Sequence, residues 1–175
     1  MSLLIAYATI EGHTGRIVRF LAERARAAGR EFTLADTLAR RAPIPMQDFD
    51  RVLLAAPVHE RRHPEAFEVF LAAQKAALNE RKTLFLSVSL SAAFEDRREE
   101  AQDYVDEMEM RTGFAADRTE LVAGAVGAVS YDYFEREVLR HVVLKDSEID
   151  PDGPQEFTDW EALGEVFDGF VAATA

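Results

Sequence analysis

The sequence predicts a three-layer α/β/α domain built on a doubly wound, five-stranded parallel sheet with the strand order 2-1-3-4-5. Short apolar runs typical of buried strands alternate along the chain with segments of helical periodicity. Strand–helix–strand connections of this kind are right-handed and place helices on both faces of a parallel sheet. The length of 175 residues matches one domain. We therefore expect residues 1–175 to form a single unit.

Each element follows from a local pattern. The apolar run Leu3–Ala8 predicts the first strand, and the spacing of apolar residues over Thr14–Ala28 predicts a helix that Gly29 ends. The other expected strands are Phe32–Leu34, Val52–Ala56, Thr83–Leu90 and Glu120–Val126. The other expected helices are Pro64–Leu78, Glu95–Met110, Tyr131–Leu144 and Thr158–Val171, the last with a capping box of Thr158 and Glu161.

Composition excludes several classes of function. The chain has no cysteine, which excludes disulfides, thiol catalysis and cysteine-based metal sites. Its net charge of −12 argues against nucleic acid and against docking on anionic lipid. Residues 135–175 alone hold 11 acidic and 3 basic residues, most of which we interpret as a solvated face. No signal peptide or membrane-spanning run is recognisable, so we expect a cytoplasmic protein.

The most informative motif is the turn between the first strand and the first helix. It reads Thr9-Ile10-Glu11-Gly12-His13-Thr14. At the amino end of a helix, free N–H groups and the helix dipole favour an anion, and hydroxyl groups add hydrogen bonds. Gly12 lets the backbone turn tightly and approach a ligand without a clashing Cβ. The turn is therefore a candidate phosphate site.

The turn does not match either common nucleotide-binding motif. A dinucleotide fingerprint needs three glycines and a nucleotide P-loop needs a lysine, and the turn has one glycine and no lysine. A T-x-x-G-x-T turn for one phosphate remains, and it resembles the phosphate loop of flavodoxins. The alternative is an ordinary strand–helix turn with Thr14 as the N-cap. A bacterial receiver domain has the same strand order but is excluded, because the third strand ends Ala55-Ala56-Pro57 and no lysine follows the fifth.

Two further loops would surround a flavin ring bound beside this turn. They are Pro57–Pro64 after the third strand and Ser89–Phe94 after the fourth. Many flavodoxins stack two aromatic rings on the flavin, whereas here only His59 or His63 and Phe94 are available. His59 and His63 also have a metal-ligand spacing, but no third ligand is evident, so we expect no metal. Arg61 and Arg62 form a solvated rim or attract an acidic substrate, and we favour the rim.

The whole chain resembles the menaquinone-dependent protoporphyrinogen IX dehydrogenases, enzymes of haem synthesis with a flavodoxin-like fold. The resemblance rests on the order and spacing of several motifs rather than on any one of them. These motifs are Tyr7–Thr14, Ala66-Phe67 with Phe70, Ser87–Leu90, Ala123–Val126, Tyr131 with Phe134 and Arg136, and Thr158–Glu161. Residues 127–157 correspond to the insertion that distinguishes this group from flavodoxins. In the family the insertion is basic and apolar, whereas here it is acidic, which does not favour membrane association.

The resemblance implies an FMN cofactor and an oxidoreductase that passes electrons from protoporphyrinogen IX to a quinone, in the cytoplasm or at the inner face of the membrane. A carrier or quinone reductase with another partner is the alternative, and a non-redox binding module of the same fold is a third. No side chain is identifiable as a catalytic base, and no oligomeric state is indicated. The expected cofactor-binding residues are Thr9, Ile10, Glu11, Gly12, His13, Thr14, Pro57, Val58, His59, Ser89, Leu90, Ser91, Ala92, Gly124 and Tyr131.

Overall fold

A computed structural model describes residues 2–39, 44–126 and 155–173 of the chain. Its central sheet is parallel and has the order β2-β1-β3-β4-β5, which confirms the predicted fold class. The strands are β1 (Ser2–Tyr7), β2 (Glu31–Asp36), β3 (Arg51–Pro57), β4 (Lys82–Ser89) and β5 (Arg118–Ala123). The central strands β1, β3 and β4 are buried almost throughout, while the edge strands β2 and β5 are partly exposed. This explains why the central strands read as continuous apolar runs.

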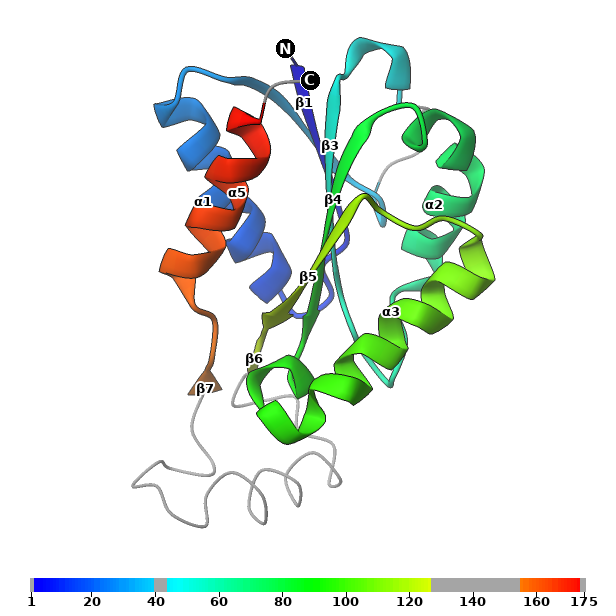
Figure 1. Ribbon diagram of the computed structural model, residues 1–175, viewed down its shortest axis with the longest axis vertical. Coiled ribbons are helices and arrows are strands. Elements are labelled where there is room, and N and C mark those ends of the chain that lie inside the picture. The colour runs from blue at the N-terminus through cyan, green and yellow to red at the C-terminus, as the bar shows by residue number, and fades with distance from the viewer. Residues whose placement is uncertain (1, 40–43, 127–154, 174–175) are drawn as a thin grey trace.

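Two pairs of helices cover the sheet, one pair on each face (Figure 1). Helices α1 (His13–Ala27) and α5 (Trp160–Ala172) lie on one face, and α2 (Glu65–Leu78) and α3 (Arg98–Thr112) lie on the other. Each face has its own core. Leu21 and Phe167 are fully buried in the first core, and Phe67 and Phe85 in the second. The predicted end of the first helix is confirmed, since Gly29 follows it with a φ of +66°.

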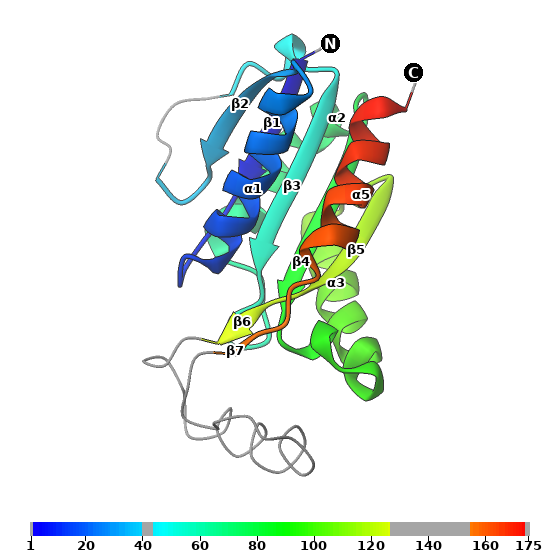
Figure 2. The ribbon, with the colours of Figure 1, turned by 90° about the vertical axis from the view of Figure 1, so that its left-hand side faces the viewer.

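The expected fifth strand, Glu120–Val126, is divided into two elements. The central sheet keeps β5, but β6 (Ala125–Val126) pairs antiparallel with β7 (Gln155–Glu156) instead (Figure 2). Gly124 lies at the change of direction. Its N–H donates to the Ser89 carbonyl at 3.0 Å, and its own carbonyl accepts from the N–H of Phe157 at 3.0 Å. Alternating apolar residues could not indicate this change of partner, because both strands have the same side-chain period.

Two predicted helix starts are wrong. Residues Ser91–Ala93 and Glu95–Arg97 form 3₁₀ turns, so α3 begins at Arg98 rather than at Glu95. The capping box of Thr158 and Glu161 is also absent. Asp159 is the N-cap of α5, and its carboxylate accepts from the N–H of Ala162 at 3.0 Å. The Thr158 hydroxyl instead donates to the carbonyl of Ala123 at 2.7 Å and lies 2.7 Å from Nε2 of His13.

The predicted helix Tyr131–Leu144 lies outside the described residues. Among the helices that the structure describes, none combines the length and apolar character needed to cross a membrane.

Candidate functional site

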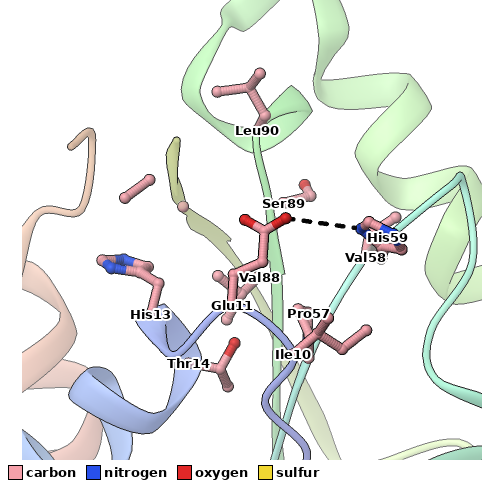
Figure 3. Close-up of a pocket in the computed structure, with 12 residues that line it drawn as sticks. Ile10, Glu11, His13, Thr14, Pro57, Val58, His59, Val88, Ser89 and Leu90 are labelled. Atoms are coloured by element: carbon pink, nitrogen blue, oxygen red, sulfur yellow. Dashed lines mark ion pairs between the residues drawn. The ribbon is translucent and has the colours of Figure 1, made fainter. Parts of the chain in front are cut away.

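A pocket opens at the carboxyl edge of the sheet, where the chain leaves β1 toward α1 on one side and β3 toward α2 on the other. This is the topological switch point at which open α/β sheets bind ligands. The labelled side chains in Figure 3 come from the β1–α1 turn, the end of β3 and the end of β4. The residues that line the pocket are Ile10, Glu11, His13, Thr14, Pro57, Val58, His59, Val88, Ser89, Leu90, Gly124 and Ala125.

The β1–α1 turn presents the amino end of α1 to this pocket. Gly12 is the N-cap, with φ +92° and ψ −15°, and its carbonyl accepts the first helical hydrogen bond from the N–H of Arg16 at 3.0 Å. The side chain of Thr9 accepts from the N–H of Gly15 at 3.2 Å. The N–H groups of His13 and Thr14 precede the first helical bond and have no partner within the helix. The turn therefore has the donors and the dipole that an anion requires.

This geometry rules out the capping role that the alternative interpretation gave to Thr14. Thr14 is not the N-cap, because the helix begins one residue earlier and Gly12 occupies that position. A Cβ on Gly12 would meet no atom within 4 Å. Glycine is needed at this position for its positive φ, and the open space beside it lets a ligand approach the backbone.

The β3–α2 loop is held in a tight hairpin beside the pocket. His59 and Arg62 exchange two backbone hydrogen bonds of 2.9 and 3.0 Å. The two residues between them, Glu60 and Arg61, both have left-handed backbones with φ of 48° and 63°. Such a turn usually contains Asn or Gly, so this one is strained. It holds His59 at the pocket mouth, where Nδ1 lies 4.0 Å from Oε1 of Glu11 on the opposite turn (Figure 3).

Arg61 and Arg62 form a rim that is paired with acidic residues, as favoured from the sequence. Arg61 lies 2.7 Å from Glu100 at the start of α3. Arg62 contacts Glu68 at 2.6 Å, and Arg111 approaches the same carboxylate at 2.8 Å. Burial raises the pKa of Glu68, but the hydrogen bonds from Arg111 and Arg62 outweigh it and leave the pKa below its usual range. Arg62 therefore holds the loop to α2 through Glu68, and Arg61 holds it to α3 through Glu100.

His63 lies in the core rather than in the pocket. Its side chain is buried, its Nε2 lies 3.0 Å from the Ser87 hydroxyl, and its ring packs near Phe85. Burial lowers the pKa of His63 to about 4. The structure thus separates His63 from His59, and no group of three potential metal ligands exists among the described residues.

His13 has a defined tautomer. Its Nε2 lies 2.7 Å from the hydroxyl of Thr158, and that hydroxyl gives its single proton to the Ala123 carbonyl. The hydroxyl must therefore accept, so Nε2 carries a hydrogen. The other nitrogen, Nδ1, is buried and has no hydrogen-bond partner among the described residues. Burial lowers the pKa of His13, against an opposing effect of the Glu156 carboxylate, so the ring is neutral near pH 7.

Most of the residues proposed from the sequence come together in this pocket. Thr9 and Gly12 shape the turn without lining the pocket. Ser91 and Ala92 are directed elsewhere: the Ser91 hydroxyl donates to Glu100, and Ala92 borders a separate hollow between β5 and α5. Phe94 does not reach the pocket either, because it packs edge-on against Phe157 with ring centroids 5.6 Å apart. Tyr131 lies outside the described residues.

Two lining residues were missed by sequence reasoning. The sequence predicts Val88 as strand interior and Ala125 as part of the fifth strand. Both line the pocket, Val88 from β4 and Ala125 from β6, where the chain has left the central sheet at Gly124.

The family model of the flavodoxin domain matches residues 4–152, and the chain belongs to this family. The protoporphyrinogen IX dehydrogenase (quinone) of Escherichia coli strain K12 is 27% identical over 166 residues, which cover 93% of this chain and 91% of that protein. The enzyme of strain O157:H7 matches equally well. These relatives confirm the resemblance inferred from the motifs and the assignment to flavodoxin-type oxidoreductases.

Solved structures agree on the fold. Oxidised flavodoxin 1 from Bacillus cereus superposes with a TM-score of 0.61 at 16% identity, over the full length of both chains. A Fusobacterium nucleatum flavodoxin bound to flavin mononucleotide superposes with a TM-score of 0.56 at 12% identity, over 97% of this chain and 96% of that one.

Proposed function

We propose that this chain is an FMN-dependent oxidoreductase that takes electrons from protoporphyrinogen IX and passes them to a quinone. The observation that carries this proposal is the pocket at the β1/β3 switch point, into which the amino end of α1 and the loops after β3 and β4 project. The named activity of the curated relatives supports the choice of substrates.

The residues of the pocket fit FMN. The N–H groups of His13 and Thr14 and the Thr14 hydroxyl would hold the phosphate, and the open space beside Gly12 leaves room for it. Val58, His59 and Leu90 would border the flavin ring. A bound flavin supplies two-electron chemistry, and porphyrinogen oxidation proceeds by repeated removal of two electrons. The protein supplies position and electrostatics.

The lining of the pocket favours an enzyme over an electron carrier. No Phe, Tyr or Trp occurs among the described residues that line it, and Phe94 is held away by Phe157. A flavin in this pocket would thus have no Phe, Tyr or Trp side chain from these residues stacked on its faces. A flat porphyrinogen or quinone needs such an open face to approach the ring.

We also propose that the insertion shapes the second substrate site. The sequence places this segment at roughly residues 127–157. Near its end, Gln155 and Glu156 form β7 and pair with β6, and Glu156 also contacts Arg16 of α1 at 2.8 Å. We propose the substrate role for the part that precedes β7.

The test is turnover by the FMN-loaded protein. It is mixed with protoporphyrinogen IX and menadione without oxygen, and porphyrin fluorescence is followed over time. The proposal predicts porphyrin formation that requires both FMN and quinone. A matched pair, Thr14→Val and Thr14→Ser, checks the site, because only the valine removes the hydroxyl. FMN-loaded protein that forms no porphyrin would contradict the proposed substrate, and oxidation of its pre-reduced FMN by menadione would then favour the alternative.

A further inference from the structure

The lining of the pocket lacks a permanent positive charge. Among the described residues that line it, none is Lys or Arg, and the acidic Glu11 is present. Of these described lining residues, the two with an imidazole side chain are His13 and His59. The two rings lie on different sides of the pocket. In Figure 3 the ring of His13 is directed away from the Glu11–His59 pair.

His13 is the better placed of the two to respond to a phosphate. It is the first residue of α1, next to Thr14, so its ring lies beside the helix end that would hold the anion. Its Nε2–H is already committed to Thr158, and Nδ1 is the remaining site for a proton. His59 lies instead on the β3–α2 loop, with Nδ1 and Nε2 each about 4 Å from the carboxylates of Glu11 and Glu60.

The groups around His13 act on its charge in opposite directions. Burial has the largest effect and opposes the protonated ring, Glu156 of β7 favours that form, and Arg16 of α1 opposes it. From α5, the indole of Trp160 meets the ring edge-on with centroids 6.0 Å apart and contributes no charge. Thr158, before α5, accepts from Nε2 in either charge state. A phosphate dianion at the start of α1 would add negative charge near His13. Like the charge of Glu156, it would favour the protonated ring.

We propose that His13 takes up a proton when FMN binds, so that its imidazolium supplies the positive charge that the pocket otherwise lacks. This inference rests on the proposed FMN site and extends it. Because binding and protonation are linked, the affinity for FMN falls as the pH rises through the range where the bound ring titrates. Riboflavin has no phosphate and shows no such dependence. His13 thereby helps the site to select the phosphorylated flavin.

Calorimetric titration of the apo-protein with FMN between pH 7.0 and 8.5 tests this proposal. The lower limit keeps the FMN phosphate ionised, since its second pKa is about 6. Repeating each titration in two buffers of different ionisation enthalpy gives the number of protons taken up. We expect net proton uptake at pH 7 and an affinity lower by about threefold or more at pH 8.5, up to the linkage limit of roughly tenfold per pH unit.

Two variants locate the proton. His13→Gln keeps an N–H donor for Thr158 but cannot bind a proton, so its FMN affinity should not depend on pH over this range. His59→Gln is the matched control and should keep the dependence of the wild type. Thermal unfolding of both apo-variants checks that they are folded.

The outcomes separate this inference from the function on which it rests. FMN binding without proton uptake by the wild-type protein would overturn the inference and leave the flavin site intact. A dependence on pH that persists in His13→Gln, or is lost in His59→Gln, would also overturn it. Failure of FMN to bind at all would contradict the proposed function, and the inference with it.

Discussion

The imidazole of His13 and the hydroxyl of Thr158 lie 2.7 Å apart, although 145 residues separate them in the chain. Through this contact the first residue of α1 is joined to the segment that leads into α5. Since the Thr158 hydroxyl also donates to Ala123, three segments around the pocket depend on one side chain.

Replacing Thr158 by Val should therefore destabilise the fold. The change removes the hydroxyl and leaves both the Ala123 carbonyl and the Nε2–H of His13 without that partner, which costs about 1–3 kcal/mol for buried polar groups. Thr158→Ser keeps the hydroxyl, so its free energy of unfolding should fall much less. Urea unfolding measures both. Equal loss in the two variants would mean that the methyl group, not the hydroxyl, stabilises this region.

Gly12→Ala and Gly29→Ala form a matched pair for the phosphate turn. Both glycines have positive φ, and an added Cβ would meet nothing within 4 Å at either. Each substitution should lower the free energy of unfolding by about 1–2 kcal/mol through backbone strain alone. Only Gly12→Ala should also weaken FMN, because relief of the strain moves the turn. The same FMN affinity in both variants, measured by flavin fluorescence, would place the phosphate elsewhere.

His63 should make the protein sensitive to mild acid. Its pKa in the fold is about 4, below the ordinary value of 6.5. The unfolded chain thus binds the proton first, so stability falls as the pH drops from 6.5 toward 4 and the effect is complete below 4. Protonation of His63 should lower the free energy of unfolding by about 3 kcal/mol at most.

The comparison for His63 is His63→Phe, whose ring can pack beside Phe85 but cannot titrate. It should be less stable at pH 7, because Ser87 loses its partner, yet its stability should change less between pH 7 and pH 4.5. Urea unfolding across this range measures the difference. Parallel curves for the two proteins would show that His63 does not carry the pH dependence.

The role proposed for the insertion can be tested by a deletion that the β6–β7 pairing makes possible. Val126 and Gln155 face each other in this antiparallel pair, so an Asn-Gly turn can join them in place of residues 127–154. We expect the shortened protein to keep most of its FMN affinity and to lose turnover with porphyrinogen and quinone. Loss of flavin from the folded protein, or unchanged turnover, would assign these residues another role.

The buried strands and the helices that cover them could be predicted from the sequence, because long apolar runs and helical spacing have few alternative interpretations. The strand order followed from them and is confirmed. Errors occurred where a side chain had two possible partners. Thr158 and Asp159 both suit an N-cap, and only the position of Ala123 shows why Thr158 is used elsewhere.

The candidate site shows the same limit. Ser91, Ala92 and Phe94 follow β4 as expected, but 3₁₀ turns and the ring of Phe157 direct them away from the pocket. The His13–Thr158 contact also has no sequence signal, since it depends on how α5 returns to α1. Local patterns identified the loops of the site, while contacts distant in sequence determine which side chains face it.

Calorimetric titration of the apo-protein with FMN and with riboflavin is the most direct test of the central claim. The phosphate turn should contribute charge-assisted hydrogen bonds, each worth about 1.5–3 kcal/mol, so FMN should bind one per chain and at least roughly tenfold more tightly than riboflavin. Equal affinities for FMN and riboflavin would contradict the assignment of the β1–α1 turn as the phosphate site.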